Sequence, residues 1–258
     1  MVFNWLKEMR RRAPQMVLPS REDRDRNKDE LDLRKFTPEP KVYLGNLAYL
    51  QLSSFEILTK ELKFSPTTLA KTQLSEAAAK SFDKYRVISR LLAKQGIDVT
   101  DAMDPYTDRI DVFHSRTTGT DWYENVIKVY LTMGMLDDFY SRLAAGLPAE
   151  MRDAVEKALA DKTIDKFAKV VLRDAMDENP QLAARLALWG RRLMGDVILE
   201  LRAVLDNQAL VGIRKRGLTL DADDERRVAI EAYSRLEPLV SELIGAHSMR
   251  MDALGLAA

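Results

Sequence analysis

The sequence has no cysteine and only two histidines, His114 and His247. Without cysteine the chain can form no disulfide, no thiolate metal site and no cysteine nucleophile, and it suits a reducing compartment. Glycine and proline are scarce, with 11 and 9 residues among 258, which favours long helices over a sheet protein with many turns. No run of about 18 apolar residues occurs, so we expect no transmembrane helix and a cytoplasmic location.

The chain also lacks an excess of charge of either sign. It carries 40 basic and 40 acidic side chains, so its formal net charge is zero. A neutral protein has no overall field that would draw it to nucleic acid or to acidic lipid. Hydrophobic residues make up 46% of the sequence, which is enough for a sizeable core.

The first 40 residues differ in composition from the rest of the chain. Trp5 and Lys7 belong to a short basic amphipathic start, and residues 21–35 are almost entirely charged. Such a segment cannot bury enough apolar surface to fold alone, so we expect residues 1–40 to be a mobile extension and residues 41–258 to form the folded domain. The amphipathic start fits contact with a membrane surface or a partner, but one short segment binds membranes weakly, so we favour a frayed helix.

Apolar residues recur at intervals of three and four along six segments, which is the spacing of an amphipathic helix. We expect helices at residues 41–62, 74–95, 121–145, 149–176, 181–208 and 221–251. No segment has the pattern of a strand, so the predicted fold class is all-α, with the first four helices as a four-helix bundle and two additional C-terminal helices outside it. The long connection at 96–119 is the crossover that such a bundle needs, and Pro105 argues against a long helix within it.

Glycine and proline inside the last two predicted helices call for explanation. Glycine lowers helix stability, so we expect Gly190 and Gly195 to let another helix approach closely, either within the chain or across a homodimer seam. Pro238 lies inside the sixth segment and is expected to kink that helix.

Asp111 and His114 have the i, i+3 spacing of two metal ligands on one helix face. A lone pair of ligands is a weak metal signal. We therefore expect His114 to be a structural histidine whose hydrogen bonds are satisfied.

Several motifs, in order along the chain, resemble those of a known family. They are YLGNLAYLQLSSFE at 43–56, DVFHSRT with TDW in 111–122, DDFY at 137–140, LALWGRRLMGD at 186–196 and AHSMRMDALGLA at 246–257. The pattern resembles the ferritin-like superfamily over roughly residues 42–257. More closely, it is similar to the actinobacterial MiaE-like group, which is related to enzymes that hydroxylate methylthio-isopentenyl-adenosine in tRNA.

The resemblance implies a carboxylate-bridged di-iron site, with one acidic residue from each of two helices and a Glu-x-x-His pair from each of the other two. This chain departs from that pattern, because Glu-x-x-His occurs nowhere in it. The residues at the corresponding positions are Gln51, Ser81, Lys84, Met133, Asp161 and Ile164. A cationic lysine adds to the charge of two irons instead of offsetting it, so we expect these positions to be vestigial, with no metal ligands, no catalytic residues and no cofactor.

The interior polar residues need another role. We expect Gln51, Ser81, Lys84 and Asp161 to form a hydrogen-bonded polar plug, with Lys84 ion-paired to Asp161, because buried charges are normally paired.

Three hypotheses for function follow. The first is a non-catalytic binding or regulatory protein on a ferritin-like scaffold that has lost its di-iron site. The alternative is a MiaE-like tRNA-modifying di-iron monooxygenase, which rests on the resemblance alone. The third is other chemistry in the vacated pocket, with Lys84 as a base or Schiff-base amine, and an ion pair is the favoured reading of that lysine.

Basic side chains in the second half of the chain are candidates for contact with tRNA or a protein partner. They are Arg191, Arg192, Arg214, Lys215 and Arg216. With zero net charge, a solvated surface is the favoured interpretation of this cluster.

Overall fold

A computed structural model describes residues 33–214, 223–224, 227 and 236–256, and of residues 205–214 it describes the backbone alone. The described residues contain helices and no strand, which confirms the all-α prediction. The predicted N-terminal extension lies outside the described residues up to residue 32. Its last residues contact the domain, because the short helix η1 (Leu33–Phe36) precedes Thr37, whose hydroxyl donates to the carbonyl of Leu143 at 2.6 Å.

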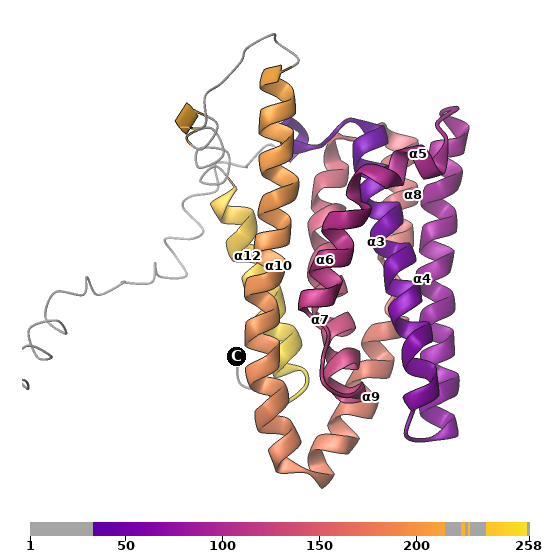
Figure 1. Cartoon of the computed structure of the whole chain (residues 1–258), viewed down its shortest axis with the longest axis vertical. Helices are drawn as coiled ribbons and strands as arrows, with labels where there is room; N and C mark the ends of the chain where they lie inside the picture. Colours follow the sequence, from indigo (N-terminus) through magenta and orange to yellow (C-terminus); the bar gives the residue numbers. More distant parts are fainter. Residues whose placement is uncertain (1–32, 215–222, 225–226, 228–235, 257–258) are drawn as a thin grey trace, which may run out of the picture. The chain divides into compact units, whose positions relative to one another are not determined.

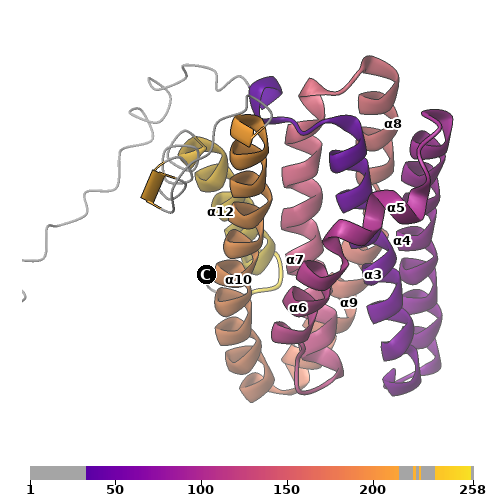
Figure 2. The same cartoon turned by 45° about the horizontal axis from the view of Figure 1, so that its top comes forward.

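Four helical segments form the bundle. α3 (Pro40–Glu61) and α4 (Thr68–Lys94) pack along each other, α7 (Trp122–Leu143) packs on α3, and α9 (Thr163–Glu178) packs on both α4 and α7. α8 (Ala149–Leu159) precedes α9 and also contacts α4 and α7. Both views show these helices side by side (Figures 1 and 2), as the sequence predicted for a ferritin-like core.

The helix starts follow from local chemistry. The side chain of Thr67 caps α4 by accepting from the backbone amide of Ala70 at 3.0 Å. Asp121 caps α7 by accepting from the amide of Glu124 at 2.9 Å, and the Glu124 carboxylate reaches back to the amide of Thr120. These caps satisfy amides that have no partner within the helix.

α7 is the central helix. Of its 22 residues, 16 are buried, because α3, α9, α10 and α12 all pack on it. A helix surrounded in this way is apolar on most of its faces, and the few polar side chains that it carries must find partners inside the protein.

The predicted fourth helix is two helices. α8 and α9 are separated at residues 160–162, where the carboxylate of Asp161 accepts from the amide of Thr163 at 3.0 Å. That interaction starts a new helix, which the continuous apolar spacing at 149–176 concealed.

The crossover between α4 and α7 contains more helix than predicted. It holds α5 (Val99–Met103), the short helix η3 (Asp104–Tyr106) and the ten-residue α6 (Thr107–Arg116). α5 and α6 lie against α3 (Figure 1). Gly45 of α3 allows this approach, because a Cβ there would overlap the backbone carbonyl of Ala102. Pro105 is the second residue of η3, so it lies between α5 and α6 and interrupts neither of them.

Two further helices lie outside the bundle, as predicted, although most of residues 221–235, the expected start of the second one, lie outside the described residues. α10 (Pro180–Arg214) packs along α7, and α12 (Glu237–Asp252) packs on α7 and α10 (Figure 2). Gly190 lies at a close approach, since a Cβ there would overlap Met251 and contact Leu131, whereas Gly195 faces open space. The predicted kink at Pro238 was wrong, because α12 begins at Glu237 and Pro238 lies in its first turn, where a proline breaks no hydrogen bond within the helix.

Candidate functional site

The centre of the bundle holds a charged side chain with its counter-ion. The ammonium of Lys84 on α4 lies 2.6 Å from Oδ2 of Asp137 on α7, and Nε2 of Gln51 on α3 donates to the other carboxylate oxygen at 2.8 Å. Lys84 and Gln51 are 7% and 1% exposed. Three helices thus join through one carboxylate whose two oxygens both accept hydrogen bonds.

Small hydroxyls and tyrosines complete this interior. Ser54 of α3 and Ser81 of α4 lie 3.3 Å apart through their hydroxyl oxygens. Tyr43 donates to the backbone carbonyl of Tyr140 at 2.5 Å, and the two rings meet edge to face. Burial raises the pKa of both phenols, so they remain protonated.

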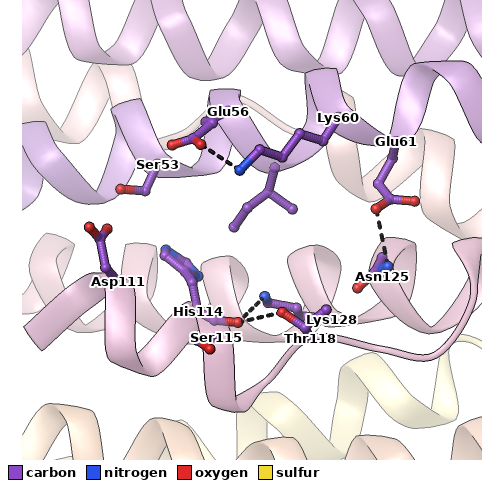
Figure 3. Close-up of a pocket in the computed structure, with 11 residues that line it drawn as sticks. Ser53, Glu56, Lys60, Glu61, Asp111, His114, Ser115, Thr118, Asn125 and Lys128 are labelled. Carbon is purple, nitrogen blue, oxygen red and sulfur yellow. Dashed lines mark hydrogen bonds and ion pairs between the residues drawn. The ribbon is translucent and has the colours of Figure 1, made fainter. Parts of the chain in front are cut away.

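A second polar site is a pocket of about 340 Å³ between α3, α6 and the first half of α7. Figure 3 shows Ser53, Asp111 and His114 toward one end, Glu61 with Asn125 at the other, and Lys128 between them. The lining residues are Ser53, Glu56, Ile57, Lys60, Glu61, Asp111, His114, Ser115, Thr118, Asn125 and Lys128.

The buried wall of this pocket carries a lysine and a histidine. Lys128 is 2% exposed, and its ammonium donates to the backbone carbonyl of His114 at 2.9 Å. Burial lowers the pKa of Lys128 to about 8. Burial and the nearby Lys128 lower the pKa of His114 to about 3, so its imidazole is neutral at pH 7.

Neither ring nitrogen of His114 has a hydrogen-bond partner in the described part of the chain. The expectation that its hydrogen bonds are satisfied was therefore wrong. Asp111, the other residue of the Asp111-x-x-His114 spacing, lines the same pocket, where its Oδ1 accepts from the hydroxyl of Tyr49 at 2.8 Å. Within the described ranges, no group of three or more His, Asp or Glu side chains is placed to hold a metal ion.

Comparison with known families shows to which family the chain belongs. A family model described as a ferritin-like domain of actinomycetes matches residues 40–215, which run from the start of α3 to the end of α10. The chain belongs to this ferritin-like family. None of the curated proteins compared with the chain matches it.

The interior of this ferritin-like domain does not fit two irons. A di-iron centre needs several anionic oxygens to offset about four or more positive charges. Among the described side chains, Asp137 brings a carboxylate to the centre, and its two oxygens already accept from a cation and an amide. Lys84 would bring a further positive charge within 2.6 Å of that carboxylate.

The structure brings some of the predicted vestigial positions together and separates others. Gln51, Ser81 and Lys84 all lie buried between α3 and α4, and Met133 is buried on α7 at 4% exposure. Ile164 is half-buried in the first turn of α9.

The predicted ion pair between Lys84 and Asp161 is wrong, because Lys84 pairs with Asp137. Asp161 lies in the break between α8 and α9 and accepts from the amide and hydroxyl of Thr163 instead. Gln51 and Lys84 meet on Asp137, whereas Ser81 bonds to Ser54 and to the carbonyl of Ala77, so the predicted plug of four residues is not one network.

The basic candidates do not form one described surface. Arg191 and Arg192 are exposed on α10, where the guanidinium of Arg192 lies over the ring of Trp189 at 5.3 Å. Arg214 is the last residue of α10, and its side chain lies outside the described residues together with Lys215 and Arg216.

Sequence reasoning missed Asp137 and Lys128. Asp137 is four residues from Met133 and three from Tyr140, so helical spacing could have placed it on the same inward face. Lys128 lies in an apolar run of the central helix, and a charge in such a run indicates a buried lysine.

Proposed function

We propose that this protein is a ferritin-like protein that has lost its di-iron centre and acts by binding, without catalysis at the bundle centre. The observation that carries the proposal is the buried ion pair between Lys84 and Asp137. A lysine that neutralises the carboxylate at this point supplies from the chain itself the positive charge that metal would bring. Gln51 reinforces the arrangement, because its amide fixes the second oxygen of Asp137.

The motifs similar to the MiaE-like group support descent from a common scaffold with tRNA hydroxylases of that kind. The residues at the ligand positions support loss of the chemistry, since an amide, a hydroxyl, an ammonium and a thioether replace carboxylates and imidazoles at Gln51, Ser81, Lys84 and Met133. On this proposal the retained bundle serves as a rigid support for surfaces and pockets that bind other molecules.

Metal analysis tests the proposal. We expect protein purified from iron-supplemented cells to contain far less than one iron per chain, and the Asp137→Asn variant to contain the same amount as the wild type. A content near two irons per chain that falls in Asp137→Asn would overturn the proposal and favour the hydroxylase.

Analysis of tRNA provides a second, independent test. We expect the hydroxylated form of methylthio-isopentenyl-adenosine to be unchanged in a strain that lacks the gene. Loss of the hydroxyl from the tRNA nucleoside, with restoration by the wild-type gene, would instead favour the MiaE-like monooxygenase.

A further inference from the structure

The pocket between α3, α6 and α7 contains buried hydrogen-bonding groups without partners. Lys128 has three ammonium protons, and the carbonyl of His114 accepts one of them. In the described part of the chain, no carboxylate lies within 4.0 Å of that ammonium. The hydroxyl of Ser53 and both nitrogens of His114 also lack partners among the described residues. Leaving such groups buried and unpaired is costly, so a ligand that pairs with them would be favoured.

Each of these three side chains can donate a hydrogen bond to a ligand. The ammonium of Lys128 has two protons to spare, the neutral imidazole of His114 has one N–H, and Ser53 has its hydroxyl proton. His114 is 9% exposed, and its ring points into the pocket (Figure 3). Donors from three helices that line one pocket, with a positive charge among them, suit a carboxylate group of a small molecule.

The other charges in the pocket restrict the choice further. Glu56 is ion-paired with Lys60 at 2.5 Å, which leaves Asp111 and Glu61 as the other carboxylates of the lining. Asp111 is exposed and accepts from Tyr49, whereas Glu61 is half-buried on α3, across the pocket from Lys128 (Figure 3). Glu61 accepts from Nδ2 of Asn125 through one oxygen only. A simple anion would be repelled by these two acids and a simple cation by Lys128, whereas a molecule with one group of each sign meets both.

We propose that this pocket binds a small zwitterion, an amino acid or ω-amino acid, with its carboxylate on Lys128, His114 and Ser53 and its ammonium on Glu61 or Asp111. A volume of about 340 Å³ lies within the range of small-molecule sites. This pocket would be the place where the proposed binding protein takes up its ligand. The pocket proposal therefore rests on the proposed binding function. Ligand occupancy and iron content are separate measurements, so either proposal can fail without the other.

Calorimetric titration of the full-length protein at pH 7 tests the proposal. The probes are glycine, β-alanine, 4-aminobutyrate and 5-aminovalerate, with butyrate and butylamine as size-matched molecules that each lack one charge. We expect at least one of the four zwitterions to bind, and butyrate and butylamine to bind at least about 10-fold more weakly. Butyrate would leave the half-buried Glu61 without a cation, and butylamine would leave the buried Lys128 without an anion.

Variants assign the binding to the pocket. Lys128→Met is expected to lower the affinity for the zwitterion at least about 10-fold, and Ser53→Ala by a smaller factor. Lys80 is exposed and lies outside the pocket lining, so Lys80→Met should leave the affinity unchanged. Ser53→Ala keeps the test valid if Lys128→Met fails to fold. Absence of binding by all four zwitterions at 10 mM (about the weakest affinity of interest), equal binding of butyrate, or unchanged affinity in both pocket variants would overturn the proposal.

Discussion

A lysine ammonium inside a helical bundle needs a counter-charge, and in this protein Asp137 supplies it. The side chains of the pair are 8% and 14% exposed, so water screens them little. Gln51 completes the arrangement by donating to the free oxygen of the carboxylate. The charge of Lys84 is thus balanced by Asp137, and Gln51 satisfies the remaining oxygen of that carboxylate.

Removal of one partner should show how far this balance matters. We expect Lys84→Met to lower the free energy of unfolding by about 3–5 kcal/mol, because it leaves Asp137 buried without its cation. The double variant Lys84→Met/Asp137→Leu should lose much less than the sum of the two single variants, since apolar groups of similar size replace both charges. Urea unfolding of all four proteins measures both effects.

An exposed pair provides the matched control. Lys80 and Asp83 are 3.7 Å apart with both side chains about half exposed, so Lys80→Met should change stability by about 0–1 kcal/mol. A loss at Lys80 as large as that at Lys84 would contradict the importance given to burial.

The two histidines predict a pH dependence of stability. Burial lowers the pKa of His114 to about 3 and that of His247 to about 4, from an ordinary value of 6.5. Between these limits the unfolded chain binds more protons than the folded one, so stability falls as the pH falls below about 6.5. At pH 5 each histidine is expected to cost about 2 kcal/mol of the stability present at neutral pH.

Urea unfolding at pH 7 and pH 5 tests this for each histidine in turn. His114→Gln and His247→Gln keep a polar side chain but remove the titrating group, so each should shrink the difference between the two pH values. A pH dependence that stays at its wild-type size in both variants would show that other groups cause it.

Predictability at this scale was partial. Helical spacing placed Gln51, Ser81 and Lys84 inside the bundle correctly, because three- and four-residue intervals fix a face. It gave Lys84 the wrong partner, because the choice between Asp137 and Asp161 depends on where a helix breaks, and the apolar pattern shows no break at Asp161.

Among the elements, the four-helix core and the two outer helices were predictable because long apolar stripes are a strong signal. The crossover was harder. α5, η3 and α6 are short, and their stability comes from packing on α3, which a propensity argument does not contain.

The seating of α5 on α3 gives a prediction with an internal control. We expect Gly45→Ala to destabilise the protein by about 1–3 kcal/mol, because the new methyl group would overlap the carbonyl of Ala102 and push α5 away. Gly195→Ala should stabilise it by about 0.5–1 kcal/mol, since that glycine is in a helix and faces open space. Thermal unfolding of the two variants compares them directly, and a stabilising Gly45→Ala would contradict the close packing.

For the whole molecule, membership of the ferritin-like family fixes the scaffold but not the chemistry. The pocket beside α3 could not be predicted, because its walls come from three elements distant in sequence. In the described ranges each helix is too short or too polar to cross a bilayer.

A protein whose interior charge is balanced by its own side chains should fold without metal. We expect EDTA, and separately added Fe²⁺, to leave the thermal midpoint unchanged, because a ligand stabilises a fold only when it binds the native state. Differential scanning calorimetry measures this, and a midpoint that drops with chelator and recovers with iron would count against the proposed loss of the metal centre.

Asp137 and Asp138 are neighbours on one turn of α7, yet their side chains contact different helices, α4 and α12. The first accepts from Lys84 inside the bundle, and the second accepts from Arg250 of α12 at 2.6 Å, while the same guanidinium also donates to the carbonyl of Gly134. This single turn of α7 therefore connects α12 to the buried ion pair at the centre of the bundle. A displacement of α12 would move Arg250, and with it the backbone of α7 at Asp138, which is bonded directly to Asp137. A change at the outer helix would therefore alter the position of the buried ion pair.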